Sequence, residues 1–267
     1  MSEHDFEDII YEVRENVAWI VINRPEKFNA FRTRTLKEMC RALEAAELDK
    51  DVRAVVLRGA GDKAFSTGGD AEEAAKGGYN EQMDYWHTSM HHQLRVITKP
   101  VIAAVNGFAI GGGHILHFVC DLSIASENAK FGQAGPRVGS FDAGFGAAYL
   151  TRVVGEKKAR EIWFLCRTYT AREALEMGLV NKVVPLSELD NEVAQWCEEI
   201  KELSPYAIRF LKHAFNADTD HILGFENLSM SAVRLFWGTD EAKEQKKLFA
   251  ERQKAKKKKR EEAKKGG

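Results

Sequence analysis

The hydrophobic positions of the chain form short apolar runs that are separated by amphipathic stretches. Residues 9–14 and 17–23 are apolar-rich and flank a short polar break, which predicts a β-hairpin. Residues 35–48 repeat apolar side chains at helical spacing and predict an amphipathic helix. The runs 54–57 and 101–105 are continuous and short, as expected of buried strands.

This alternation continues to residue 203, and from Tyr206 onward the pattern predicts only helices. Further strands are expected at 121–125 and 179–184, and further helices at 83–97, 115–120, 146–153, 157–166, 171–177 and 186–203. Strands that alternate with helices are typical of an α/β sheet with crossover helices. We expect residues 71–81 to form a mobile lid, with Gly77-Gly78 either as its hinge or as the end of a short helix.

The composition fits one large domain, or one domain with a helical extension. The chain has 267 residues, of which 44% are hydrophobic and 30% charged, enough to bury a core. No apolar run is long enough to span a bilayer, and the polar, acidic start is unlike a signal peptide. Four scattered cysteines without a close pair favour reduced thiols, so we expect a cytoplasmic protein with no membrane partner.

The net charge of −1 hides a strongly basic end. Residues 254–265 hold seven Lys, one Arg and two Glu, a local charge of +6. Such a block is usually a solvated tail, and we expect residues 254–267 to be disordered. Nucleic-acid binding is the sharper alternative. The block has no interleaved aromatic side chains and the rest of the chain is acidic, so no nucleic-acid partner is expected.

Two glycine-rich turns concentrate the candidate chemistry. The first is FSTGGD at residues 65–70, and the second is NGFAIGGGH at residues 106–114. Each follows an apolar strand and can present free backbone N–H groups, which is most marked where a helix begins. A lone glycine run more often serves only close packing. Two turns that face each other can bracket one oxygen that becomes negative during a reaction, as an oxyanion hole does.

These turns, together with the loop FGQAGPRVGSFD at residues 131–142, resemble the crotonase (enoyl-CoA hydratase/isomerase) superfamily over about residues 6–253. The segments 139–142, 154–163 and 174–181 are most similar to the branch of 1,4-dihydroxy-2-naphthoyl-CoA synthase and 2-ketocyclohexanecarboxyl-CoA hydrolase. The resemblance implies an α/β spiral of ββα units, here residues 1–200, that binds an acyl-CoA thioester. It also implies that the helical residues 201–253 drive assembly into a homotrimer or a hexamer of two trimers.

The resemblance also assigns roles to individual residues. The catalytic positions would be Gly69, Gly112, Ser140, Asp142 and Tyr79. The substrate- or CoA-binding positions would be Lys27, Thr67, Gly68, Asp70, Phe108, Ile110, Gly111, Trp237 and Arg252. No cofactor is expected to bind tightly. Many synthases of this branch use bicarbonate as a base, and the matching pocket here would be Gln133, Ala134 and Gly135.

In that scheme the backbone N–H groups of Gly69 and Gly112 polarise the thioester carbonyl and favour an enolate. Asp142 moves protons, provided that partial burial raises its pKa. Ser140 hydrogen-bonds a substrate carbonyl. Without the two glycine turns, the preferred interpretation is that Ser140 and Asp142 only form an Asx or Ser turn.

The chain departs from the family where hydratase chemistry is carried. Family hydratases add water with two glutamates, and the matching positions here are Ile115 and Gly135, neither of which can move a proton. The synthases carry a tyrosine near the start of the last helix, where this chain has Trp237. A tryptophan donates one hydrogen bond but does not titrate. These departures leave the acyl group open.

Two histidine pairs stand at helical spacing. His87 and His91 are four residues apart, so a metal pair is conceivable. No cysteine or acidic cluster lies near them in the sequence, and we expect no metal. His114 and His117, three residues apart, favour packing or capping roles.

The sequence therefore favours an enzyme that forms or cleaves a carbon–carbon bond in an acyl-CoA through a thioester enolate. Ring closure and hydrolytic ring opening share these intermediates, so the direction stays open. The second interpretation is a generic enoyl-CoA hydratase or isomerase that uses Asp142 alone. The third is a binding protein that kept the fold and uses its basic tail on RNA or another partner.

Overall fold

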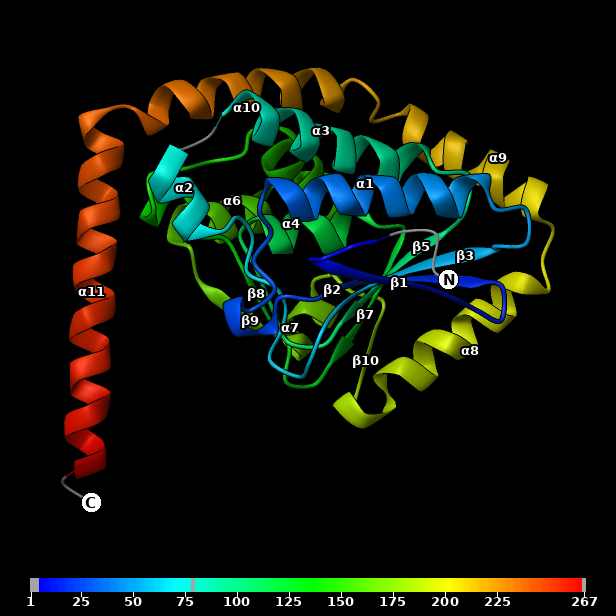
Figure 1. Ribbon diagram of the computed structural model, residues 1–267, viewed down its shortest axis with the longest axis horizontal. Helices are drawn as coiled ribbons and strands as arrows, with labels where there is room; N and C mark the ends of the chain where they lie inside the picture. The colour runs from blue at the N-terminus through cyan, green and yellow to red at the C-terminus, as the bar shows by residue number, and fades with distance from the viewer. Residues whose placement is uncertain (1–4, 78–79, 266–267) are drawn as a thin grey trace.

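The computed structural model describes residues 5–77 and 80–265 (Figure 1). Its strands are β1 (Ile9–Arg14), β2 (Val17–Ile22), β3 (Ala54–Gly59), β4 (Ala64–Ser66), β5 (Val101–Val105), β6 (Phe108–Ile110), β7 (Leu122–Ser126), β8 (Lys130–Gly132), β9 (Thr168–Thr170) and β10 (Lys182–Val184). Its helices are α1 (Thr33–Leu48), α2 (Ala71–Gly77), α3 (Glu81–Val96), α4 (Gly112–Val119), α5 (Leu150–Val154), α6 (Glu156–Leu165), α7 (Ala171–Glu176), α8 (Leu189–Lys201), α9 (Pro205–Ala217), α10 (Ile222–Trp237) and α11 (Asp240–Lys265). A π-helical segment, η3 (Gly144–Tyr149), precedes α5.

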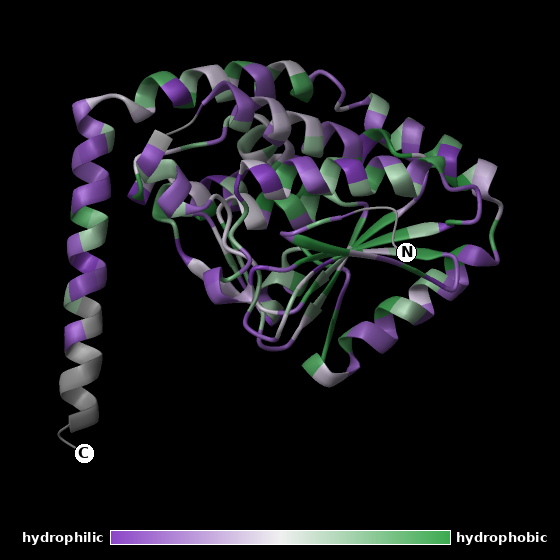
Figure 2. Ribbon diagram, viewed as in Figure 1, coloured by the Kyte–Doolittle hydropathy of each residue, from purple (hydrophilic) through white to green (hydrophobic). Residues whose placement is uncertain are grey.

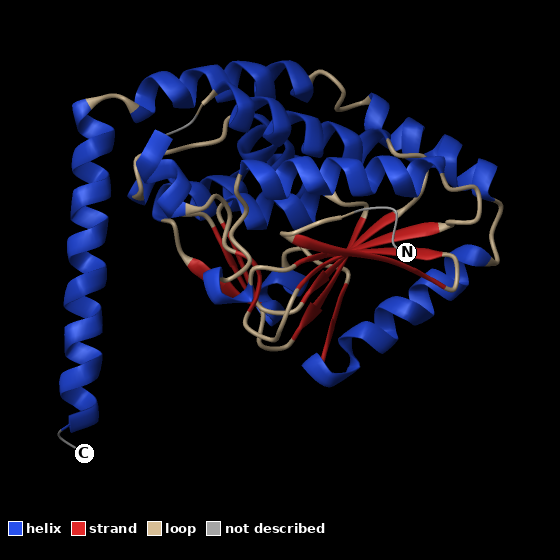
Figure 3. Cartoon of the chain, in the orientation of Figure 1, coloured by secondary structure: helices blue, strands red, loops and turns tan. Residues whose placement is uncertain are grey.

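The strands form two sheets that the chain visits in turn (Figure 3). The larger sheet has the order β1-β2-β3-β5-β7-β10, in which only β1 and β2 pair antiparallel. The smaller sheet has the order β4-β6-β8-β9. The pairs β3–β4, β5–β6 and β7–β8 each send one strand to each sheet before a helical segment follows. This repeat is the predicted spiral of ββα units, and the α/β fold class is confirmed.

The larger sheet carries an apolar core on each face because its strands alternate side chains between the two faces. Val55 and Leu57 of β3 belong to the larger core, which includes α1, α3 and α4. Val56 belongs to the second core, which α8 covers with residues such as Val193. Figure 2 shows the hydrophobic strands between these helices. Alternation in β3 thus fixes which helix packs on which face.

The predicted hairpin, the helix at 35–48 and the strands at 54–57 and 101–105 are confirmed. The predicted pattern missed β4, β6, β8 and β9, because three residues are too few to show a period. In the predicted lid, residues 71–77 form the helix α2. The other half of the proposed hinge, Gly78, lies outside the described residues.

The C-terminal part is helical, as expected. The prediction of a disordered tail is wrong for residues 254–265, which continue α11. Lys, Glu, Ala and Arg are all good helix formers, and this outweighs the repulsion of a basic block. Figure 1 shows that α11 runs along one side of the molecule and that its C-terminal part extends away from the other helices and strands. Large apolar side chains are exposed on α9 and α10: Tyr206, Phe210, Leu211, Phe215, Phe225, Leu228 and Leu235.

The described helices include none that is both long and apolar enough to cross a membrane. The four cysteines are free and buried.

Candidate active site

The two glycine turns lie directly against each other. Gly68 has a φ of +84°, a left-handed conformation that favours glycine. A Cβ atom on Gly68 would lie 2.7 Å from the backbone nitrogen of Gly112. A Cβ atom on Gly112 would lie 2.5 Å from Cζ of Phe31. The glycines are therefore needed for the close approach of the two turns, and the predicted pairing of the turns is present.

The N–H groups of Gly69 and Gly112 are suited to bind an oxyanion. Gly112 is the first residue of α4, where the N–H groups have no partner within the helix and the helix dipole is positive. Among the turn and loop hydrogen bonds of the described residues, neither N–H is a donor. Both glycines line one cavity. Two backbone donors are thus available to a carbonyl oxygen there.

The cavity has a volume of about 380 Å³ and brings together most of the predicted site. The predicted residues that line it are Thr67, Gly69, Asp70, Ile110, Gly111, Gly112, Gln133, Ala134, Gly135, Ser140, Asp142 and Trp237. Its apolar lining includes Phe31, Met83, Ile115, Trp163, Val233 and Phe249. An apolar wall with a few convergent polar groups is typical of a small-molecule site.

Four predicted residues in the described part of the chain do not line this cavity, and one of them, Gly68, packs against Gly112 instead. Lys27 forms an ion pair with Glu72 of α2, so its charge is already partnered. Phe108 is 42% exposed and does not line the cavity. Arg252 is exposed on α11. Tyr79 lies outside the described residues.

Asp70 anchors the first turn. Its carboxylate is buried and forms an ion pair of 2.7 Å with Arg24. It also accepts the N–H groups of Glu72 and Glu73 at the start of α2. Burial opposes its ionisation, but Arg24 and these N–H donors outweigh burial and lower the pKa of Asp70. It lines the cavity as a fixed charge and not as a proton carrier.

Asp142 has the opposite electrostatics. It is buried, and its Oδ1 accepts the N–H groups of Gly144 and Gly146. Its Oδ2 has no hydrogen-bond partner among the described residues. Burial, reinforced by the nearby charge of Glu226, raises the pKa of Asp142 to about 8. The predicted Asx turn is real, yet it leaves one oxygen and a titratable proton for chemistry.

Ser140 belongs to the same loop as Asp142 and lines the same cavity. It is buried, and its N–H donates to the carbonyl of Gly135 at 2.9 Å. A Cβ atom on Gly135 would lie 2.7 Å from the Ser140 carbonyl oxygen and 2.9 Å from the Trp163 ring. Gly135 is therefore required for this packing against the backbone of Ser140 and the ring of Trp163.

The residues of the predicted bicarbonate pocket line the cavity but provide neither free space at Gly135 nor an unpartnered side-chain donor nor positive charge for an anion. The room that a side chain would fill at Gly135 is already taken by Ser140 and Trp163. The side-chain nitrogen of Gln133 is 3.0 Å from Nδ1 of His114 and so has a partner. No Lys or Arg is among the described residues that line the cavity. These residues do not fit a bound bicarbonate, and we derive no step through it.

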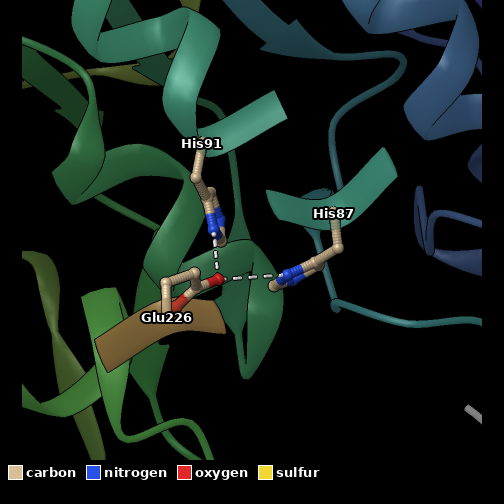
Figure 4. Close-up of side chains that lie close together, drawn as sticks. All are labelled: His87, His91 and Glu226. Carbon is tan, nitrogen blue, oxygen red and sulfur yellow. Dashed lines mark hydrogen bonds and ion pairs between the residues drawn. The ribbon is translucent and has the colours of Figure 1, made fainter. Parts of the chain in front are cut away.

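Figure 4 shows a buried cluster that the sequence did not predict, and charges of this cluster act on Asp142. It consists of His87 and His91 on α3 and Glu226 on α10. Oε1 of Glu226 is 3.0 Å from Nδ1 of His91 and 3.4 Å from Nδ1 of His87. His87 lines the cavity together with Asp142. The spacing of the histidines was visible in the sequence, but nothing local in the sequence indicates Glu226.

The cluster divides its charge unequally. Burial opposes ionisation of Glu226, but the two imidazoles outweigh burial and lower its pKa. Burial likewise opposes a charge on His87, but Glu226 outweighs it and raises the pKa of His87. Burial, then the charge of His87, lowers the pKa of His91. Glu226 is therefore ionised, His91 is neutral, and His87 and Asp142 hold the exchangeable protons.

The fold brings to the His87–His91 pair an acidic residue, Glu226, that lies far from the pair in the sequence. Two imidazole nitrogens and a carboxylate oxygen are ligands that Zn²⁺ accepts. These ligand atoms lie within 4.8 Å of one another. Without any ion, His91 forms a hydrogen bond with Glu226, whereas Nδ1 of His87 and Nε2 of His91 have no hydrogen-bond partner among the described residues.

The chain is similar to known proteins over nearly its whole length. A family described as enoyl-CoA hydratase/isomerase matches residues 12–260. An enoyl-CoA hydratase/isomerase from Xanthobacter autotrophicus Py2 is 30% identical, with a TM-score of 0.84 over 94% of this chain and 99% of that one. An enoyl-CoA hydratase from Mycobacterium avium subsp. paratuberculosis K-10 is 26% identical, with a TM-score of 0.83 over 93% and 97%. A monofunctional enoyl-CoA isomerase from M. smegmatis is 30% identical, with a TM-score of 0.69 over 80% and 94%.

Proposed function

Because the chain belongs to the enoyl-CoA hydratase/isomerase family and is an acyl-CoA enzyme of that type, we propose that it forms or cleaves a carbon–carbon bond through a thioester enolate. The observation that carries the proposal is Asp142, a buried carboxyl with a pKa raised to about 8, at the cavity lined by Gly69 and Gly112. The positions that resemble the hydratase glutamates are Ile115 and Gly135, so a two-glutamate addition of water is disfavoured.

The thioester carbonyl accepts the N–H groups of Gly69 and Gly112. As a proton leaves the α-carbon, negative charge moves onto that oxygen, where the two donors bind it more strongly than in the ground state. Asp142 carries the proton to and from the α-carbon. Ser140 lines the same cavity, and we assign it a hydrogen bond to a second carbonyl of the acyl group. One proton carrier next to two fixed donors is sufficient to form and quench an enolate.

Ring closure, as in the 1,4-dihydroxy-2-naphthoyl-CoA synthase branch, and hydrolytic ring opening both pass through this enolate. Mass spectrometry of o-succinylbenzoyl-CoA, incubated with the protein with and without bicarbonate, tests closure as the loss of one water. The same assay on 2-ketocyclohexanecarboxyl-CoA tests opening as the gain of one water. Turnover of either one that is lost in Asp142→Asn supports the proposal. An α-carbon that exchanges no deuterium in any acyl-CoA contradicts it.

A double-bond isomerase is the second candidate. An isomerase moves one proton between two carbons and needs one carrier, which Asp142 supplies. A similar structure is described as a monofunctional enoyl-CoA isomerase. Conversion of 3-enoyl-CoA to 2-enoyl-CoA that is abolished by Asp142→Asn, without any change in carbon–carbon bonds of the ring substrates, favours this candidate. Turnover of crotonyl-CoA to a hydrated product would favour the hydratase instead.

Assembly of several copies is part of the proposal. The apolar side chains exposed on α9 and α10, such as Phe215 and Leu228, are suited to a second copy of the chain. A homotrimer or a pair of trimers is the expected assembly, by resemblance to the family. Sedimentation that compares the wild type with the double variant Phe215→Asp/Leu228→Asp tests this assembly. Two charged side chains on this surface should lower the measured mass of the particle towards that of a single chain.

A further inference from the structure

The proposed enolate chemistry uses Asp142 and leaves the His87–Glu226 pair without a role. Glu226 is fully buried, and its Oε2 accepts the N–H of Phe145 at 3.1 Å. A Cβ atom on Gly144 would lie 2.2 Å from that same oxygen, so the loop is shaped to let the carboxylate approach. A buried charge is costly to desolvate. Its position against a cavity-lining imidazole makes it a candidate functional group.

Nδ1 of His87 has no hydrogen-bond partner among the described residues, and the carboxylate of Glu226 lies on that side of the ring at ion-pair distance. Nδ1 is the ring nitrogen that lies 3.4 Å from Oε1 of Glu226 (Figure 4). A carboxylate at Nδ1 favours a proton on that nitrogen, which leaves the lone pair on Nε2. The carboxylate also stabilises the imidazolium that forms when Nε2 takes up a proton. His87 lines the cavity, whereas His91 is fully buried behind it.

We propose that His87, oriented by Glu226, is a second catalytic acid–base residue that activates a water molecule for hydrolytic cleavage beside Asp142. The inference rests on the proposed function and assigns the direction of its reaction. The substrate is an acyl-CoA with a carbonyl group at the β-carbon. The apolar lining of the cavity favours a hydrocarbon chain or ring around that carbonyl.

The cleavage balances with one water and no oxidant. Neutral His87 takes a proton from water while the water oxygen bonds to the β-carbonyl carbon. The tetrahedral oxyanion collapses to a carboxylic acid, and the bond between the β-carbon and the α-carbon breaks. Its electron pair forms the thioester enolate, held by the N–H groups of Gly69 and Gly112. Asp142 gives its proton to the α-carbon, and the proton held by His87 replaces it.

The proton inventory of the site matches these roles. Asp142 is protonated below a pH of about 8, as an acid must be. The groups that face His87 are Glu226 from α10, His91 and Asp84 from α3, and Asp142 from the loop. One protonated carboxyl and one neutral imidazole make up the reactive form, which has the same number of protons as a carboxylate with an imidazolium.

The test compares His87→Gln with a matched control, His92→Gln, which lies on the same helix and is exposed. Glutamine keeps a polar group at position 87 but cannot accept a proton. Two reactions are measured in D₂O: hydrolysis of 2-ketocyclohexanecarboxyl-CoA and α-deuterium uptake by butanoyl-CoA, which has no β-carbonyl. We expect His87→Gln to lower hydrolysis by about 10²-fold, the low end for general acid–base catalysis, and to keep deuterium uptake within about threefold. The control keeps both.

Each other outcome contradicts the inference, and the outcomes separate it from the proposed function. Hydrolysis that survives in His87→Gln overturns the role of His87 while the enolate chemistry stands. Equal loss of both reactions shows that His87 supports the fold or the enolate step and does not activate water. A wild type that takes up no deuterium contradicts the proposed function and this inference together. A wild type that exchanges deuterium and closes a ring, but never hydrolyses one, overturns the direction alone.

Two readouts do not depend on substrate choice. NMR of ¹⁵N-histidine, assigned by the His87→Gln difference, should show that the pKa of His87 falls in Glu226→Gln, because the carboxylate raises it in the wild type. A pKa that does not move overturns the pairing. Metal analysis of the purified protein should find less than about 0.1 ion per chain. A stoichiometric ion whose removal abolishes hydrolysis would assign His87, His91 and Glu226 as its ligands and overturn proton transfer by His87.

Discussion

The two histidine pairs of this protein look alike in the sequence and differ in chemistry. His87 and His91 on α3, and His114 and His117 on α4, are all buried and at helical spacing. Nδ1 of His114 is 3.0 Å from the amide of Gln133, and Nδ1 of His117 is 3.2 Å from the hydroxyl of Ser123. The α3 pair instead shares the carboxylate of Glu226.

The partner, and not the spacing, decides what each pair can do. Burial alone lowers the pKa of His114 to about 3, so the α4 pair stays neutral and serves packing, as predicted. An ionised carboxylate raises the pKa of His87 in equally deep burial. The difference teaches that an imidazole in a dry site becomes a proton carrier only when the fold brings a charge to it.

The largest expected effect comes from replacing Asp142, whose carboxyl group lines the cavity together with His87. Asp142→Asn should lower α-deuterium exchange by about 10³-fold, since an amide cannot carry the proton. In the wild type, exchange should increase with pH up to about 8 and then level, because the carboxylate form removes the proton. Hydrolysis should instead fall above that pH, because it needs the acid form. Rates of both reactions measured from pH 6 to 10 check this prediction. If exchange and hydrolysis change in the same direction with pH, Asp142 does not act as a base in exchange and as an acid in hydrolysis.

Neutralising Glu226 should make the α3 pair behave like the α4 pair. Glu226→Gln removes the charge that raises the pKa of both His87 and Asp142. Hydrolysis should fall by about 10²-fold, in line with loss of one acid–base group. The alkaline limb of the pH profile should also move to lower pH, because Asp142 then ionises more easily. An alkaline limb that stays in place would show that Glu226 does not act on Asp142.

The α4 pair should matter for stability and not for rate. The folded-state pKa of His114 is lowered, so its stabilising effect is full above pH 6.5 and is lost as pH falls below that value. Between pH 6.5 and 5 one such group costs about 2 kcal/mol. Between pH 6.5 and 5, the free energy of unfolding measured with urea should therefore fall by about 2 kcal/mol less in His114→Leu than in the wild type, although the variant is less stable at pH 7. If the free energy of unfolding depends on pH equally in the variant and the wild type, His114 is charged in the folded protein.

The smallest expected effect comes from giving the α4 pair a carboxylate of its own. Gln133→Glu places an acid within about one hydrogen bond of Nδ1 of His114, where the amide now lies at 3.0 Å. The pKa of His114 should then rise by about one unit or more, since an opposite charge favours the imidazolium. NMR titration of His114 measures this. A pKa that remains near 3 would show that burial overrides the partner, and the comparison of the two pairs would fail.

What could be predicted from the sequence was local. The glycine turns and Asp142 lie within one stretch of chain, and their residue types announce backbone donors and a turn. The contact between His87 and Glu226 joins positions on α3 and α10, and it depends on how those helices pack. No period or motif encodes it, because each residue alone fits an ordinary amphipathic helix. The helical tail was missed for a related reason, since charge density argued against order while helix propensity favoured it.

The most direct test of the central claim is deuterium uptake at the α-carbon of butanoyl-CoA in D₂O, followed by mass spectrometry for the wild type and Asp142→Asn. The account predicts that the wild type exchanges the α-hydrogens and that the variant exchanges them about 10³-fold more slowly, with the fold intact by circular dichroism. Equal exchange by the two proteins, or none by the wild type, would contradict an enolate formed at Gly69 and Gly112 by Asp142.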